Sequence, residues 1–163
     1  MERIAVFVGS FDPFTRGHLD IAKRALTLFD KLIIALGVNA SKQCLFNEQS
    51  RKAIIHDALV EENRFEVRGF NGLTAQFCQA HKAKFLIRGL RSGSDFDYEK
   101  TIAQANAMLA PELETVFLMT RPEHAAISST VVRDILLHGG DASQFLPPNI
   151  DIAKYLPTTP QQL

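Results

Sequence analysis

Short apolar runs alternate with longer helical patterns along almost the whole chain of 163 residues, and this alternation limits its fold more than any other feature. It is typical of βαβ units, in which helices join parallel strands. Strands are predicted near Arg3 to Val8, Lys31 to Val38, Arg64 to Val67, Lys84 to Arg88 and Thr115 to Met119. Because these runs are nearly continuously apolar, helices should cover both faces of the sheet. The fold class is therefore predicted to be α/β, a Rossmann-like doubly wound sheet of five parallel strands.

Helical patterns fill the gaps between these strands. Apolar residues recur at helical spacing from Leu19 to Phe29, and Asn47 can cap a helix that runs from Glu48 towards Val60. Further helices are predicted around Thr74 to His81, Ser94 to Leu109, Ser129 to His138 and Asn149 to Tyr155. The length suits one domain over residues 1–163, with 157–163 as a frayed tail.

Charge and cysteine content exclude several classes of protein. Lys and Arg together number 18, as do Asp and Glu, so the chain offers no strongly basic surface to nucleic acid or to an acidic membrane. Cys44 and Cys78 form neither a CxxC motif nor a Cys/His cluster, and no apolar run is long enough to span a bilayer. A cytoplasmic, reducing location is expected, with both cysteines as packing residues.

Ligands of such sheets bind beyond the carboxyl ends of the strands, where the stretch "VGSFDPFTRGHLD" follows the first strand. Gly9 and Gly17 permit backbone geometry closed to other residues, and Pro13 fixes one turn between them. His18 falls in the first turn of the next helix, where an imidazole can donate a hydrogen bond to a phosphate. A histidine that only caps or packs is an equally open interpretation here.

The stretch "ISSTVVRD" places three hydroxyl residues, Ser128, Ser129 and Thr130, at the start of another helix. Their hydroxyls and the free N–H groups predict an anion site, although one of them could be an ordinary N-cap. Arg133 favours the anion site, because a cation in a first helical turn is unfavourable without a counter-charge. A bound triphosphate would supply that counter-charge.

The stretch "LIRGLRSGSDFDYE" places Arg88 and Arg91 at the end of an apolar strand. Arginine suits bidentate phosphate recognition, so both are expected to face the crevice, unless they pair with Asp95, Asp97 or Glu99. Glu99 shares a helical face with apolar residues, which is costly unless something is bonded to it. A ribose, an amine or a neighbouring arginine would serve.

Two motifs in these stretches resemble those of the nucleotidyltransferase superfamily: Thr15 to His18 matches (H/T)xGH, and Ile127 to Arg133 matches ISSTxxR. "LIRGLRSGSDFDYE" followed by "LAPELETVFLM" is similar to the phosphopantetheine adenylyltransferase family of bacterial coenzyme A synthesis. The resemblance covers roughly residues 1–156. It implies the penultimate step of that synthesis: ATP and 4′-phosphopantetheine give dephospho-coenzyme A and pyrophosphate. The acceptor phosphate attacks the α-phosphorus in line, without a covalent enzyme intermediate.

The resemblance also implies roles for individual residues. His18, Lys42 and Arg91 would be catalytic, with His18 stabilising the transition state. The expected ATP contacts are Ser10, Phe11, His18, Gly89, Leu90, Arg91, Glu99, His124, Ala125, Ala126, Ile127, Ser128, Ser129 and Thr130. The expected contacts to the pantetheine substrate are Ser10, Lys42, Thr74 and Arg88. Physical reasoning agrees, because transfer between two phosphates mainly requires bringing two anions together and stabilising charge on the α-phosphate.

Partners and departures follow from the same resemblance. Mg²⁺ is expected to arrive with ATP, since no Asp/Glu cluster indicates a dedicated metal site. A homohexamer and feedback inhibition by coenzyme A are implied as well. Ser10 replaces the family's usual threonine and keeps the hydroxyl, whereas His124 replaces a frequent aromatic residue and "QANAML" stands where many members have "MNRxL". The latter two changes fall where the resemblance implies adenine-site packing and contacts between subunits, so these two features are expected to depart from the family's pattern.

Two other functions stay open from the sequence. The chain could adenylylate another acceptor, such as nicotinamide mononucleotide, because the two superfamily motifs support nucleotidyl transfer more than any one substrate. It could also be a non-catalytic regulator that binds ATP without turnover, a function for which an altered His18 or Arg91 would be the mark; both residues are present.

Overall fold

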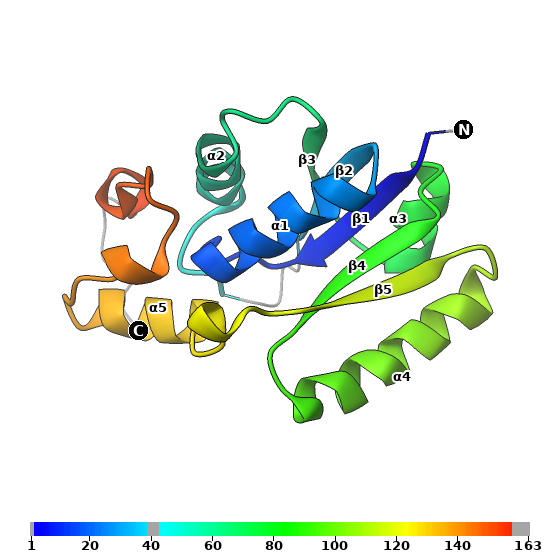
Figure 1. Ribbon diagram of the computed structural model, residues 1–163. Coiled ribbons are helices and arrows are strands. Elements are labelled where there is room, and N and C mark those ends of the chain that lie inside the picture. Colours follow the sequence, from blue (N-terminus) through cyan, green and yellow to red (C-terminus); the bar gives the residue numbers. More distant parts are fainter. Residues whose placement is uncertain (1, 39–42, 158–163) are drawn as a thin grey trace.

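A computed structural model of the chain describes residues 2–38 and 43–157 (Figure 1). Five parallel strands form one sheet in the order β3-β2-β1-β4-β5. Their bounds are β1 (Ile4–Gly9), β2 (Lys31–Gly37), β3 (Phe65–Phe70), β4 (Phe85–Leu90) and β5 (Glu114–Met119). The strand order reverses between β1 and β4, as in doubly wound sheets, so the predicted fold class is confirmed. All five predicted strands are present, and β3 and β4 extend further than predicted, to Phe70 and Leu90.

The α-helices lie where the sequence predicted them. Their bounds are α1 (Arg16–Leu28), α2 (Glu48–Ala58), α3 (Thr74–Ala80), α4 (Gly93–Leu109) and α5 (Ser129–Leu137). Asn47 caps α2 as predicted, because its side chain accepts a hydrogen bond from the backbone N–H of Ser50.

The helix predicted over Asn149 to Tyr155 is wrong in extent, since only a 3₁₀ turn over Ile152–Tyr155 forms. Asp151 caps this turn by accepting from the backbone N–H of Ala153, which delays its start. Pro157 then keeps Leu156 in an extended conformation and ends the turn.

Helices cover both faces of the sheet, because successive strand residues point to opposite sides. Phe7, Ile34 and Ile87 belong to the larger core, which α1 and α2 cover. Their neighbours Val6, Ile33 and Leu86 belong to a second core, which α3 and the segment after α4 cover. Figure 1 shows the layers, with α1 in front of the sheet and α3 behind it. The two-sided burial explains why the strands read as continuous apolar runs.

Cys44 and Cys78 are both free thiols within the described part of the chain. Cys78 is fully buried in the second core, and this burial raises the pKa of its thiol to about 11. The thiol of Cys78 therefore stays protonated and serves as a packing residue, as predicted. Across residues 2–38 and 43–157, no helix has the length and apolar character needed to cross a membrane.

Candidate active site

A crevice of about 360 Å³ opens at the carboxyl ends of β1 and β4, where the strand order reverses. The structure brings together many of the predicted site residues as its lining, namely Ser10, Phe11, His18, Arg88, Gly89, Arg91, Glu99, Ile127, Ser128, Ser129 and Thr130. Other predicted residues are not in this lining, namely Thr74, Leu90, His124, Ala125 and Ala126. Lys42 lies outside the described residues.

The loop between β1 and α1 runs past the crevice and is shaped by Phe11. This residue is only 2% exposed and has a φ of 47°, in the left-handed region. A Cβ placed on Gly9 would lie 2.9 Å from the ring of Phe11, so glycine is required there for space. Gly9 and Gly17 permit backbone geometry closed to other residues, but neither uses it, because neither has a positive φ.

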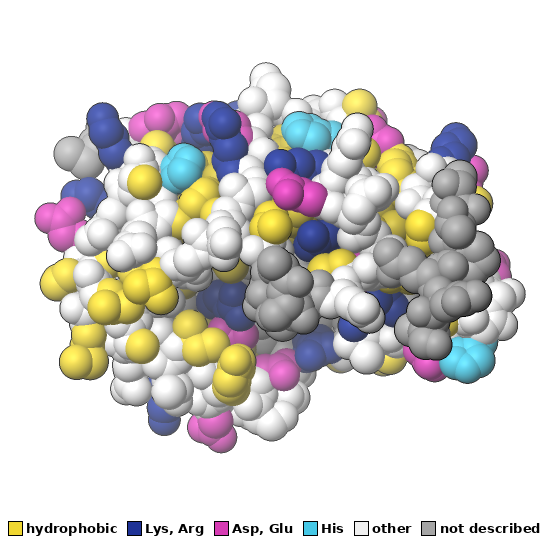
Figure 2. Space-filling model, turned by 180° about the vertical axis from the view of Figure 1, so that it is seen from behind, with side chains coloured by type: hydrophobic (Ala, Val, Ile, Leu, Met, Phe, Trp, Pro, Cys, Tyr) yellow, Lys and Arg dark blue, Asp and Glu magenta, His cyan; other side chains and the backbone are white. Residues whose placement is uncertain are grey.

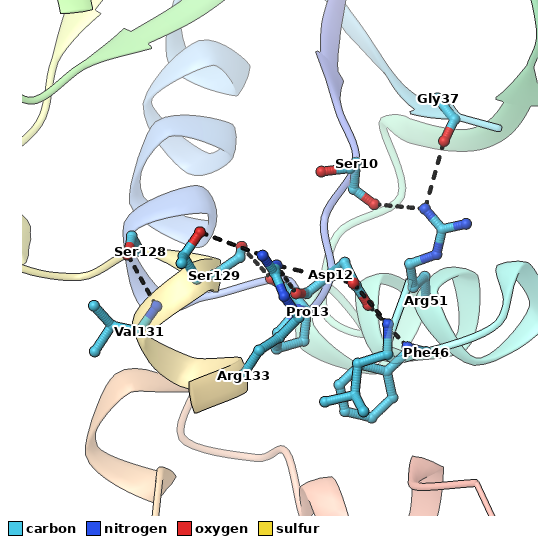
Figure 3. A network of polar contacts seen from close by, with 12 residues as sticks. Ser10, Asp12, Pro13, Gly37, Phe46, Arg51, Ser128, Ser129, Val131 and Arg133 are labelled. Atoms are coloured by element: carbon cyan, nitrogen blue, oxygen red, sulfur yellow. Dashed lines mark hydrogen bonds and ion pairs between the residues drawn. The ribbon is translucent and has the colours of Figure 1, made fainter. Parts of the chain in front are cut away.

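Hydrogen bonds from two helices hold the backbone of this loop in place (Figure 3). From α2, the Nη1 of Arg51 donates to the carbonyl of Ser10 at 2.8 Å and to that of Gly37 at 3.5 Å. From the start of α5, the hydroxyl of Ser129 donates to the carbonyl of Pro13 at 2.8 Å. The loop is thus fixed from both sides before any ligand binds.

Asp12 is a buried carboxylate inside the same loop, and it was missed at the sequence level. It accepts hydrogen bonds from the backbone N–H groups of Leu45 and Phe46, both at 2.9 Å. Arg133 of α5 donates to the Asp12 carbonyl at 2.7 Å and lies 3.8 Å from its carboxylate. Arg133 is the fifth residue of α5, so the prediction that it lies in the first helical turn is wrong, and its counter-charge is Asp12, where a triphosphate was expected. The signal was an acidic residue in the apolar stretch from Phe11 to Phe14, because a carboxylate requires bonded partners when it is buried.

His18 completes a capping box at the start of α1. The side chain of Thr15 accepts from the backbone N–H of His18 at 3.4 Å, and the backbone N–H of Thr15 donates to Nδ1 of His18 at 3.1 Å. Because a backbone N–H can only donate, Nδ1 must be the acceptor, and the neutral ring carries its proton on Nε2. The capping interpretation of His18 therefore holds, and it leaves Nε2–H as a donor.

Aromatic rings surround His18. The ring centroids of Phe7, Phe11 and Phe14 lie 6.2, 5.0 and 5.5 Å from that of His18. Burial among them, with a smaller contribution from the positive charge of Arg91, lowers the pKa of His18 to about 4. At neutral pH the imidazole is therefore uncharged, with its single proton fixed on Nε2.

Both arginines of the β4 end are paired with carboxylates of α4. Arg88 makes a bidentate pair with Glu99, at 2.6 Å from Nε and 2.5 Å from Nη2, and its Nη1 donates to the carbonyl of Val8 at 3.1 Å. Arg91 is 45% exposed and makes a longer contact of 3.4 Å with Asp95. The carboxylate pairing that the sequence left open is therefore present at both positions.

At the start of α5, the hydroxyls have different partners. Ser128 is the N-cap and accepts from the backbone N–H of Val131 at 3.2 Å, which was the alternative interpretation of this stretch. The hydroxyl of Ser129 donates to the carbonyl of Pro13 in the β1–α1 loop. Thr130 is exposed, and its hydroxyl accepts from Nη2 of Arg133 at 3.3 Å. What this helix start offers an anion is chiefly Thr130 and its first free N–H groups.

The segment ahead of α5 packs beside the start of α1. His124 ends a 3₁₀ turn, and a Cβ on Gly17 would lie 3.9 Å from the Cβ of His124. Its Nδ1 is buried and has no hydrogen-bond partner within the described part of the chain, whereas Ala125 and Ala126 are exposed. Within residues 2–38 and 43–157, no group of three or more His, Cys, Asp or Glu side chains could hold a metal ion.

The chain is similar to known proteins over most of its length. The cytidylyltransferase-like family model matches residues 6–135. The chain is 51% identical over 147 residues to a phosphopantetheine adenylyltransferase of Cytophaga hutchinsonii, covering 90% of this chain and 98% of that protein. It is 44% identical over 152 residues to the phosphopantetheine adenylyltransferase of Flavobacterium johnsoniae, covering 93% and 99%.

A solved structure shows the same fold. It is a bifunctional NMN adenylyltransferase/ADP ribose pyrophosphatase from Francisella tularensis, complexed with AMP and Mn ion. The TM-score is 0.67 at 19% identity, and the match covers 93% of this chain and 46% of that chain.

Proposed function

The chain belongs to the phosphopantetheine adenylyltransferase family, and we propose that its crevice transfers the adenylyl group of ATP to 4′-phosphopantetheine, giving dephospho-coenzyme A and pyrophosphate. Membership makes the chain a nucleotidyltransferase of coenzyme A synthesis. The proposal extends to how the crevice works: the acceptor phosphate attacks the α-phosphorus directly, and the protein supplies position and charge.

The observation that carries this mechanism is the fixed tautomer of His18. A neutral imidazole with its proton on Nε2 can donate to a phosphate oxygen but cannot repel Arg91. A donor fixed in place costs no reorganisation when charge develops on the α-phosphate. Ser10, the free N–H groups at the start of α5 and Thr130 would add donors for the other phosphates.

Arg88 is proposed to hold the acceptor phosphate, together with Lys42, Ser10 and Thr74. Its guanidinium lines the crevice, where the carbonyl of Val8 and the carboxylate of Glu99 occupy its nitrogens, and the acceptor phosphate would replace Glu99. Arg91, more exposed and more loosely paired, would turn to the phosphates of ATP.

Mg²⁺ is proposed to enter with ATP and to be held mainly by phosphate oxygens. The carboxylates that line the crevice, Asp95 and Glu99, already engage arginines, while the other polar side chains there are hydroxyls and His18. This donor set suits an ion that keeps its waters and its phosphate ligands. When bound, Mg²⁺ neutralises charge on the triphosphate and on the leaving pyrophosphate.

A homohexamer, coenzyme A as an inhibitor and a cytoplasmic location are also proposed. Figure 2 shows hydrophobic side chains gathered on the side of the molecule where α4 lies. The proposed cytoplasmic location agrees with the two free thiols, which suit a reducing compartment.

For the proposed assembly, the exposed residues of α4 are relevant: Tyr98 is 68% exposed, Met108 86% and Leu109 55%, which suits a surface covered by another subunit. Light scattering measures the mass of the assembly: Met108→Lys should lower it, whereas Lys100→Ala, an exposed control on α4, should not, and an unchanged mass in Met108→Lys would count against this surface.

The acceptor assay tests the function itself. Wild-type protein is incubated with ATP, Mg²⁺ and either 4′-phosphopantetheine or nicotinamide mononucleotide, and pyrophosphate is measured. We expect release with phosphopantetheine. Release with the mononucleotide alone would overturn the proposal, and ATP binding without turnover on either acceptor would identify a regulator.

A further inference from the structure

Asp12 carries a carboxylate close to a site that we propose for a triphosphate, where electrostatic repulsion makes a negative charge unfavourable. It lies next to Phe11 and two residues from Ser10, both of which line a crevice that we propose to bind a triphosphate. Its side chain is only 5% exposed, so water screens its charge poorly. A carboxylate there should repel phosphates, so its contacts must supply something that offsets the repulsion.

The contacts of Asp12 join three segments that are distant in sequence (Figure 3). Its carboxylate accepts from Leu45 and Phe46, 33 and 34 residues away, in the segment just ahead of α2. Its backbone carbonyl and its carboxylate both engage Arg133 of α5, 121 residues away. One residue thus fixes the β1–α1 loop against the segment before α2 and against the start of α5.

Arg133 is committed to this arrangement. Its Nη1 is used by Asp12, and its Nη2 donates to the hydroxyl of Thr130 at 3.3 Å. The guanidinium lies 3.8 Å from the buried carboxylate of Asp12 and would weaken the compensation of that charge if it moved to a nucleotide, which is costly. Its place in the ISSTxxR motif therefore does not require it to touch the phosphates.

We propose that Asp12 is a positioning residue for adenylyl transfer, and that Arg133 acts through Asp12 and not on the nucleotide. The pair sets the distance between Ser10 on one side of the triphosphate and the start of α5 on the other. This inference rests on the proposed function. An error of about 1 Å in such spacing costs about 10²-fold in rate, so the fixed spacing outweighs the repulsion.

In the variant Asp12→Asn, charge repulsion and positioning predict changes in ATP affinity of opposite sign. Removing a negative charge near the phosphates should tighten ATP binding if charge alone matters. Positioning predicts the opposite: about tenfold weaker ATP binding by calorimetry and a kcat lower by about 10²-fold at saturating ATP. Tighter or unchanged ATP binding with unchanged kcat would overturn the proposal, as would a lower Tm alone.

Arg133→Lys keeps the inference testable if Asp12→Asn does not fold. Lysine retains the positive charge but lacks the second N–H arm that reaches Thr130 while the first holds Asp12. We expect kcat to fall by about tenfold, whereas Asp134→Asn, the exposed neighbour on the same helix, should leave kcat unchanged. Wild-type kcat in Arg133→Lys would contradict the proposal.

A double-mutant cycle tests whether Arg133 acts through Asp12. If it does, the loss of kcat in the double variant Asp12→Asn/Arg133→Met is smaller than the product of the two single losses, because both substitutions break the same ion pair, although the carbonyl of residue 12 still accepts from Arg133 in Asp12→Asn. Independent action on the nucleotide would make the two losses multiply. Turnover by the wild type tests the proposed function separately. If phosphopantetheine is not the acceptor, the same double-mutant cycle can be measured on ATP affinity instead of kcat.

Discussion

The two sides of the crevice are held together in different ways. On the β1 side, the loop is fixed by buried groups such as Arg51 and Asp12, and His18 has one tautomer fixed by a backbone N–H. On the β4 side, Arg88 and Arg91 are held by carboxylates, which a phosphate can replace. The difference indicates a preorganised half that stabilises charge and an exchangeable half that receives the anions.

The largest expected effect comes from the preorganised half. His18→Ala should lower kcat by about 10²-fold or more, because it removes a donor that acts on developing charge. ATP affinity, measured by calorimetry, should change much less. His56→Ala, an exposed histidine of α2, is the control and should retain wild-type kcat. Equal losses in kcat and ATP affinity would show that His18 binds only ground-state ATP.

Adding one methyl group by a glycine-to-alanine substitution tests whether the two halves of the crevice differ in packing. Gly9→Ala should lower the free energy of unfolding by about 1–3 kcal/mol, because its Cβ would lie 2.9 Å from the buried ring of Phe11. Gly93→Ala, at the start of α4, is the matched control, since beyond its chain neighbours and its own helix backbone no described atom comes within 4 Å of its Cβ. We expect the control to be neutral or slightly stabilising in urea denaturation. Equal destabilisation of both variants would contradict the comparison.

Acid should weaken the preorganised half through His18. Its pKa is about 4 in the folded chain and about 6.5 when unfolded, so between these values the unfolded chain binds more protons. The contribution of neutral His18 to stability is therefore present above pH 6.5 and is lost as the pH falls towards 4. Between pH 7 and pH 5 the loss should be about 2 kcal/mol.

Urea denaturation of the wild type and of His18→Gln at both pH values isolates this effect, because glutamine does not titrate. A His18 contribution that is the same at both pH values would show that the imidazole is not held neutral. Imidazole ¹⁵N shifts at pH 5.5 provide a direct check and should report the Nε2–H tautomer.

Much of the fold could be predicted because burial on both faces of the sheet leaves continuous apolar runs. The predicted ends of β3 and β4 fell short because the last residues of these strands break that pattern. Arg68 and Gly69 in β3, and Arg88 and Gly89 in β4, interrupt the apolar run while the ladder continues. In β4 these residues line the crevice, and residues at functional sites often depart from the apolar pattern of the strand that carries them.

The predicted site contained the residues whose local context carries a signal, such as His18 in a first helical turn or Arg88 at a strand end. Asp12 and Arg51 could not be found that way. Their partners lie 34 and 41 residues away, at Phe46 and Ser10, and long-range pairing leaves no periodic trace in a sequence. The only hint was at Asp12, an acidic residue in the otherwise apolar stretch from Phe11 to Phe14.

The smallest expected effect comes from the exchangeable half. In Glu99→Gln, Arg88 loses its competing negative charge, so a phosphate no longer has to displace a carboxylate from two of its nitrogens. The KM for 4′-phosphopantetheine should fall by about three- to fivefold, the value of a partly exposed ion pair. Asp97→Asn, exposed on the same helix, should leave this KM unchanged. A raised KM in Glu99→Gln would show instead that the carboxylate orients Arg88 for its substrate, and both halves of the crevice would then be preorganised.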